Sequence, residues 1–182
     1  MKKFLSLALA VVMTVSMLAG CGSKTAPTET TAAPKASLEG TMEELLNKIV
    51  AENPVEFMGG VIPVDLTDTS EDGLWALKNF TGLDSAENIT EAAAFEPMMG
   101  SMAFSMVMVR VAEGADSKAV AESMKAGIDT RKWICVEANE PMAAGYGDVV
   151  MFIMLNNELG LTAQSFVDAF GKVAGAELDF TI

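Results

Sequence analysis

Among side chains that bind soft metal ions, methionine is the most abundant in this sequence, since the 182 residues include 14 methionines, two cysteines and no histidine. Five methionines lie close together in one segment: Met98, Met99, Met102, Met106 and Met108. Soft sulfur ligands suit Cu(I), but methionine also fills irregular gaps in a core. Because Met102, Met106 and Met108 share strand parity, we interpret them as core and assign no metal or cofactor. A methionine-based Cu(I) binder remains an alternative, and it would recruit Met142, Met151 and Met154 across the sheet.

Signatures of catalysis are otherwise sparse. Without histidine, the chain has no Ser-His-Asp or Cys-His nucleophile pair and no histidine-based zinc motif. The 25 acidic side chains make carboxylate pairs inevitable, so spacing alone identifies no acid–base pair. Cys135 lies in the apolar run 133–136, where we expect a buried, unreactive thiol. The sequence therefore favours a protein that is not an enzyme.

The N-terminus has the features of an export signal. Lys2 and Lys3 precede an apolar run of about fifteen residues, shorter than the roughly 20 residues of a membrane-spanning helix. The run ends in the tetrapeptide LAGC at residues 18–21, which resembles the bacterial lipobox. That resemblance implies a lipoprotein signal peptide over residues 1–20 and acylation of Cys21 by palmitate-type chains. The alternative is an ordinary secretory signal that is cleaved near Ala19.

Residues 21–37 form the predicted lipidated cysteine and a flexible tether. The tether is rich in Thr, Ala and Pro and has no large apolar side chain, so it cannot bury enough surface to fold. Sixteen extended residues reach at most about 55 Å. The net charge of −13 argues against a nucleic-acid partner. We expect a domain tethered to the extracytoplasmic face of the cell membrane, with the bilayer as one partner.

Residues 38–182 are expected to form a single α+β domain. Hydrophobic periodicity, caps and turn residues predict its elements. The expected helices begin near Thr41, Ser70, Asp116 and Leu161. Four strands are expected, over residues 88–95, 102–111, 133–138 and 149–155. Residues 61–66 are a candidate edge strand, and residues 178–182 are a candidate terminal strand.

Strand-strand-helix order occurs twice, which predicts a two-layer sandwich. Its antiparallel sheet should have about four or five strands, with helices mainly on one face. In residues 149–155 both the odd and the even positions are apolar, so both faces of this strand should be buried. The second face of the sheet should therefore be covered by the N-terminal helices or by a partner.

Met98 and Met99 lie at a predicted hairpin turn, where polar residues or glycine are usual. Two adaptable apolar side chains at such a position indicate a contact with another protein. The alternative is that the turn folds back onto its own domain.

Three strand segments, residues 103–110, 131–138 and 147–154, together with the lipobox, resemble an uncharacterised family of small lipoproteins of Gram-positive anaerobes, a domain of unknown function. The resemblance implies location in the cell envelope and association with membrane-bound O-acyltransferase systems that modify surface polymers. We therefore expect a non-catalytic accessory or binding module with an envelope protein or polysaccharide partner. A carboxylate-dependent enzyme acting on envelope polymers is the alternative.

Overall fold

A six-stranded antiparallel sheet is the centre of the domain. The computed structural model describes residues 37–182; the predicted signal peptide, Cys21 and the tether up to residue 36 lie outside that range. The strand order is β1-β2-β3-β5-β4-β6. The strands are β1 (Gly59–Pro63), β2 (Ile89–Pro97), β3 (Phe104–Val111), β4 (Glu140–Tyr146), β5 (Val149–Leu155) and β6 (Phe180–Thr181).

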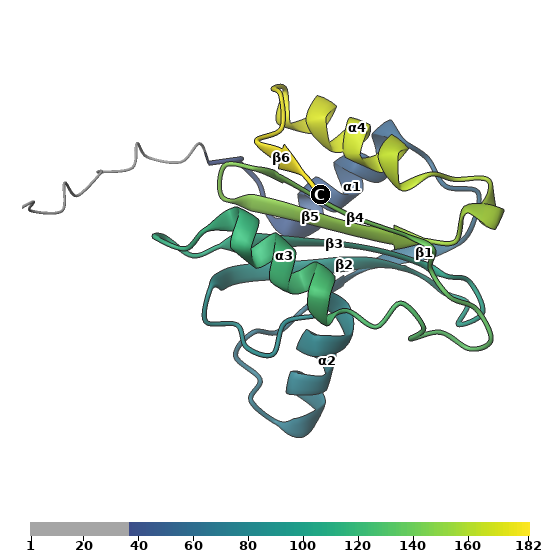
Figure 1. Cartoon of the computed structure of the whole chain (residues 1–182), viewed down its shortest axis with the longest axis horizontal. Coiled ribbons are helices and arrows are strands. Elements are labelled where there is room, and N and C mark those ends of the chain that lie inside the picture. The colour runs from purple at the N-terminus through teal and green to yellow at the C-terminus, as the bar shows by residue number, and fades with distance from the viewer. Residues whose placement is uncertain (1–36) are drawn as a thin grey trace, which may run out of the picture. The chain divides into compact units, whose positions relative to one another are not determined.

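Helices cover both faces of the sheet (Figure 1). They are α1 (Met42–Glu52), α2 (Glu71–Thr81), α3 (Ser117–Gly127) and α4 (Ala163–Ala174), and a short 3-10 turn, η1 (Asn157–Leu159), precedes α4. One face packs against α1 and α4, and the other packs against α2 and α3. In the described part of the chain, none of the helices has the length and apolar character needed to span a membrane.

The predicted α+β class and antiparallel sheet are confirmed, with one or two more strands than expected. The helices, however, form two outer layers, so the domain has three layers. The reason lies in β5, in which all seven residues are buried. Met151 and Ile153 pack toward α1 and α4, while Val150 and Phe152 pack toward α2 and α3. The second face is therefore covered by the same chain.

Helix starts follow the predicted caps. The Thr41 hydroxyl accepts a hydrogen bond from the Glu44 backbone N–H at 3.1 Å, and the Glu44 carboxylate accepts one from the Thr41 N–H at 3.2 Å. Ser70 caps α2 and Asp116 caps α3. These side chains satisfy N–H groups that have no partner within a helix.

The predicted strand over residues 133–138 is wrong, because that segment is part of an irregular loop. The actual strand is β4, which is poor in β-branched residues. Its Gly145 is required by packing: an added Cβ would lie 2.3 Å from the Phe180 ring. The expectation that Cys135 is buried in the predicted strand is also wrong. The residue is exposed and has a positive φ of 64°.

Pro63 lies on an edge strand, as predicted, although β1 covers residues 59–63 and not 61–66. Proline has no N–H to donate to a ladder, so a position at the edge of a sheet suits it.

Candidate functional site

Apolar side chains gather at one end of the sheet. Met98 and Met99, in the turn between β2 and β3, are 69% and 57% exposed. Met58, just before β1, is 76% exposed, and Ile134 in the loop before β4 is 72% exposed. We call these four residues the apolar tip. The turn does not bury its methionines against its own domain.

Main-chain hydrogen bonds join the three segments of the apolar tip. The Met98 N–H donates to the Met58 carbonyl at 2.9 Å. On the other side of the turn, the Ile134 N–H donates to the Gly100 carbonyl at 3.0 Å. Side chains that are far apart in the sequence therefore occupy one continuous end of the molecule.

A buried ammonium group supports the loop that carries Ile134. Lys132 Nζ donates to Glu96 Oε1 at 2.8 Å and to Ser105 Oγ at 3.1 Å. Its third donor reaches the Asn79 carbonyl of α2 at 3.1 Å. The Lys132 side chain is only 6% exposed, and it also lies 5.3 Å from the ring centroids of Phe80 and Trp133. We call Lys132, Glu96 and Ser105 the Lys132 cluster.

The chemistry of the Lys132 cluster is that of an ion pair. Burial lowers the pKa of Lys132 from its usual 10.5, and the Glu96 carboxylate partly opposes that shift. The Ser105 hydroxyl donates to Glu96 at 2.6 Å, so the lysine does not accept its proton as it would in a Ser–Lys nucleophile pair. Glu96 is the penultimate residue of β2, and Ser105 is the second residue of β3. The cluster therefore fixes the loop at the base of the apolar tip.

Sequence reasoning missed the Lys132 cluster because its members lie in separate segments. One signal was present: Ser105 is the single hydroxyl in the apolar run 103–109. A buried polar side chain needs a hydrogen-bond partner, so Ser105 pointed to a polar group on the α2 and α3 face of the sheet.

A second ionic cluster lies at the other end of the sheet, beside the first described residues. Arg110 Nη1 lies 2.6 Å from Asp148 Oδ2, and Arg110 Nη2 donates to the carbonyls of Leu38 and Gly40 at 3.0 and 2.7 Å. Arg110 is thus shared between the sheet and the first described residues. These contacts hold residues 38–40 against the sheet.

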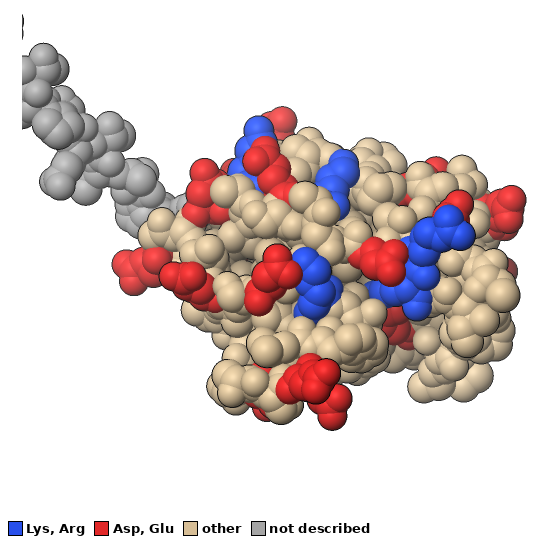
Figure 2. Space-filling view, turned by 60° about the horizontal axis from the view of Figure 1, so that its bottom comes forward, with Lys and Arg blue, Asp and Glu red and all other residues tan. Residues whose placement is uncertain are grey.

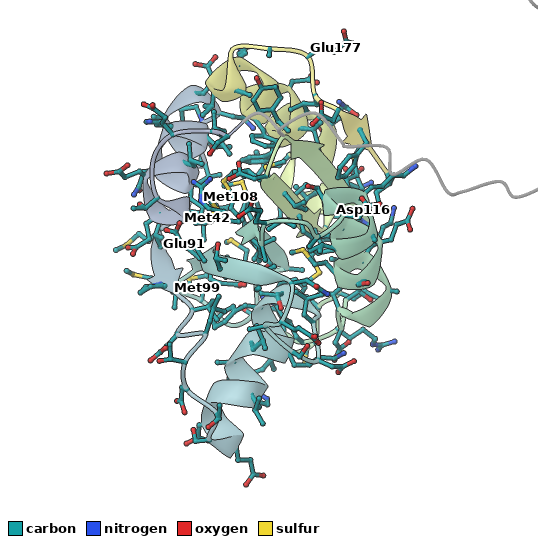
Figure 3. All side chains as sticks on the ribbon, turned by 90° about the vertical axis from the view of Figure 1, so that its left-hand side faces the viewer. Met42, Glu91, Met99, Met108, Asp116 and Glu177 are labelled. Atoms are coloured by element: carbon teal, nitrogen blue, oxygen red, sulfur yellow. The ribbon has the colours of Figure 1, made fainter. Side chains whose placement is uncertain are left out.

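Glu91 of β2 extends this second cluster to the start of α1. Its carboxylate accepts a hydrogen bond from the Met42 N–H at 2.8 Å, and Figure 3 shows the two residues side by side. A carboxylate at a helix N-terminus is favourable because it faces the positive end of the helix dipole.

The apolar tip and the first described residues lie at opposite ends of β3. The strand begins at Phe104, next to the turn that carries Met98 and Met99, and its penultimate residue is Arg110. Eight residues of strand extend about 26 Å. In Figure 1 the first described residues lie at the left end of the sheet and the β2–β3 turn at the right. The apolar tip therefore lies at the end of the domain that is far from its first described residues.

Most of the other described methionines belong to one of the two cores, whereas Met102 lies in the turn before β3 and is only partly buried. Met106, Met108 and Met151 are fully buried between the sheet and α1 or α4, and Met108 is directly opposite Met151 in the β3–β5 ladder. Met108 is labelled in Figure 3. Met154 was expected to adjoin them, but it packs on the other face of the sheet. Met142 is partly buried on the α1 and α4 face. Packing accounts for the buried members.

Carboxylates line three hollows on the described surface. One of about 310 Å³, between α3 and the loop after α2, includes Asp84 and Asp116. A second, of about 420 Å³ beside the loop before β4, includes Glu137, Glu158 and Cys135. A third, of about 550 Å³ beside α4, includes Asp168 and Glu177. Within residues 37–182 no three His, Cys, Asp or Glu side chains are grouped to hold a metal ion. Figure 2 shows acidic side chains spread over the α2 and α3 face.

Comparison of the chain with protein-family models, with curated proteins and with solved structures found no significant match. The resemblance to a lipoprotein family, and what it implies, therefore stay predictions.

Proposed function

We propose that this protein is a membrane-anchored, extracytoplasmic binding module of the cell envelope. It is held by acylated Cys21 and uses the apolar tip to bind an envelope protein. One observation carries the proposal: four exposed apolar side chains gather at the end of the sheet opposite the first described residues.

The composition of the apolar tip favours a protein partner over a polysaccharide. Three of its four exposed side chains are methionines, which adapt to different partner surfaces. Methionine is also enriched in the buried centres of protein interfaces. None of the four side chains offers the hydrogen-bond donors or acceptors that a hydroxyl-rich polymer requires.

Rigidity below the tip supports binding because an ordered surface loses less entropy when a partner docks. The Lys132 cluster holds the loop of Ile134, and main-chain hydrogen bonds hold Met58 and the β2–β3 turn. The net charge of −13 adds a second effect, since an acidic domain is repelled by anionic lipid and kept away from the bilayer.

The test is capture of partners by full-length protein purified from membranes, with the double variant Met99→Ser/Ile134→Ser. We expect this variant to lose about 90% of the captured partner, in keeping with a contact that carries much of the binding energy. Trp75→Ser is the matched control, because Trp75 on α2 is 64% exposed but belongs to another surface. The proposal fails if the double variant captures the same proteins as wild type, or if purified cell-wall polysaccharide binds at the tip in place of a protein.

A further inference from the structure

We infer that the free edge of β1 binds an extended, positively charged segment of the partner, which adds a strand to the sheet. This inference rests on the proposed binding role, because it assigns a geometry to the partner of the apolar tip. Among residues 37–182, β1 pairs with β2 on one side and has no strand on the other.

The alternation of hydrogen-bonded residues along β1 shows which of its backbone groups are free to bind an added strand. Met58 and Val64 form main-chain hydrogen bonds with β2, through Met98 and Ala92. In an antiparallel ladder the bonded residues alternate, so the even positions of β1 face β2 and the odd positions face outward. Gly59 and Val61 therefore present an N–H and a carbonyl each to an incoming strand. Pro63 presents a carbonyl only, which ends the available ladder.

Side chains along this edge form a notch. Met58 is 76% exposed and Ile62 is 39% exposed, and Gly60 lies between them on the same face of the strand. A Cβ built on Gly60 would have only the Met98 methyl within 4 Å, at 3.9 Å. One apolar side chain of an added strand fits above Gly60, in contact with the methionines of the apolar tip. Edge pairing of this kind combines main-chain bonds with side-chain pockets.

Charge determines the kind of segment that fits. Residues 49–77 include six acidic side chains and no lysine or arginine. Glu56, three residues before β1, and Asp65, two residues after it, are both exposed. Hydrogen bonds from Thr67 lower the pKa of Asp65, which keeps it ionised. Opposite charges therefore favour a segment rich in lysine or arginine.

A second copy of this chain fits the edge poorly. Two β1 edges related by a two-fold axis would place their acidic flanks against each other. Antiparallel pairing would also turn the tether end of one copy toward the apolar tip of the other. A partner segment has neither disadvantage.

The test is hydrogen exchange of the full-length protein, measured at single residues with two synthetic octapeptides, (Lys-Val)4 and (Glu-Val)4. We expect (Lys-Val)4 to slow exchange of the Gly59 and Val61 amides by about tenfold and (Glu-Val)4 to have no effect. The Val64 and Met98 amides already bond within the sheet, so they report on the integrity of the fold. Gly60→Val, which fills the notch, should abolish the protection, whereas Gly100→Ala at an open turn position should retain it.

Three results overturn the inference. They are unchanged exchange with millimolar (Lys-Val)4, equal protection by both peptides, and protection that grows with protein concentration when no peptide is present. The last result would place a second copy on the edge. Retained protection in Gly60→Val would contradict the notch. If the apolar tip still captures its partner in a tip-dependent way, only the edge assignment fails and the proposed function stands.

Discussion

The Nζ atom of Lys132 and the Oε1 atom of Glu96 lie 2.8 Å apart beneath an exposed apolar surface, although the two residues are 36 positions apart in the chain. Their side chains are 6% and 12% exposed. A buried ion pair contributes little net stability by itself, but removal of one partner leaves an uncompensated charge. We regard this pair as the support of the apolar tip.

Lys132→Met should therefore destabilise the domain. We expect a loss of about 3 kcal/mol in the free energy of unfolding, because Glu96 would remain charged and poorly solvated. The double variant Lys132→Met/Glu96→Met should recover much of that loss. Urea denaturation measures both. Lys125→Met, on the exposed side of α3, is the control. Equal stability of wild type and Lys132→Met would show that the pair does not hold the loop.

The lowered pKa of Lys132 also gives a pH dependence. At a pH below the pKa of Lys132 in the folded protein, this lysine is charged in both the folded and the unfolded state. Folding then carries the full cost of burying the charge. Between that value and the unfolded value of 10.5, the unfolded state binds more protons, so stability rises with pH. The free energy of unfolding of wild type relative to Lys132→Met should increase as pH rises toward 10.5. A decrease would mean that attraction to Glu96 outweighs burial.

Local signals predicted much of this fold. The Thr41 and Glu44 pair predicted the start of α1, and the apolar run at 149–155 predicted β5 with its bounds. Both depend on neighbouring residues alone. The loop at 133–138 was predicted as a strand because Trp, Ile and Val favour β structure. The true strand, β4, depends instead on Gly145, whose lack of a side chain admits the ring of Phe180.

The candidate site was predicted only in part, because sequence patterns report local features and not contacts between distant residues. Met98 and Met99 were identified because a turn is a local feature and apolar residues are unusual there. Met58 and Ile134 join them through tertiary hydrogen bonds that no spacing reveals. Helices cover both faces of the sheet because the side chains of β3 and β5 are mostly apolar on both faces and need to be buried there.

Arg110→Ala should loosen the start of the domain. It removes hydrogen bonds to Leu38 and Gly40 and leaves Asp148 without its cation. We expect a loss of about 2 kcal/mol in the free energy of unfolding, since the Arg110 side chain is only 20% exposed. Hydrogen exchange over residues 38–46 should accelerate. Arg131→Ala removes an exposed pair with Glu137 and should have an effect below about 1 kcal/mol. Similar effects of the two variants would count against an anchoring role for Arg110.

Methionines of the core and of the apolar tip should respond differently to substitution. Met106→Ala creates a cavity at a fully buried position and should cost about 2–5 kcal/mol of stability. Met99→Ala, at a position 57% exposed, should change stability by less than about 0.5 kcal/mol. Thermal unfolding compares the two. A large loss in Met99→Ala would indicate that the turn packs on its own domain after all.

Cys21→Ala tests the proposed anchor. Without its thiol the chain cannot receive the acyl chains, each of which contributes about 0.8 kcal/mol per buried methylene. We expect the variant to lose labelling by radioactive palmitate and to move from the membrane fraction to the medium. Cys135→Ala is the control, because Cys135 belongs to the folded domain. Membrane sedimentation of an unlabelled Cys21→Ala protein would contradict lipid anchoring at this residue.

The most direct test of the binding role is photo-crosslinking in intact cells from one position at each end of the sheet. A photoreactive amino acid is placed at Met99 in the apolar tip, or at Glu113, which is exposed three residues after Arg110 at the tether end. The account predicts one discrete crosslinked envelope protein from position 99 and none from position 113. The same product from both positions, or no product from position 99 under conditions where the protein is anchored, would contradict it.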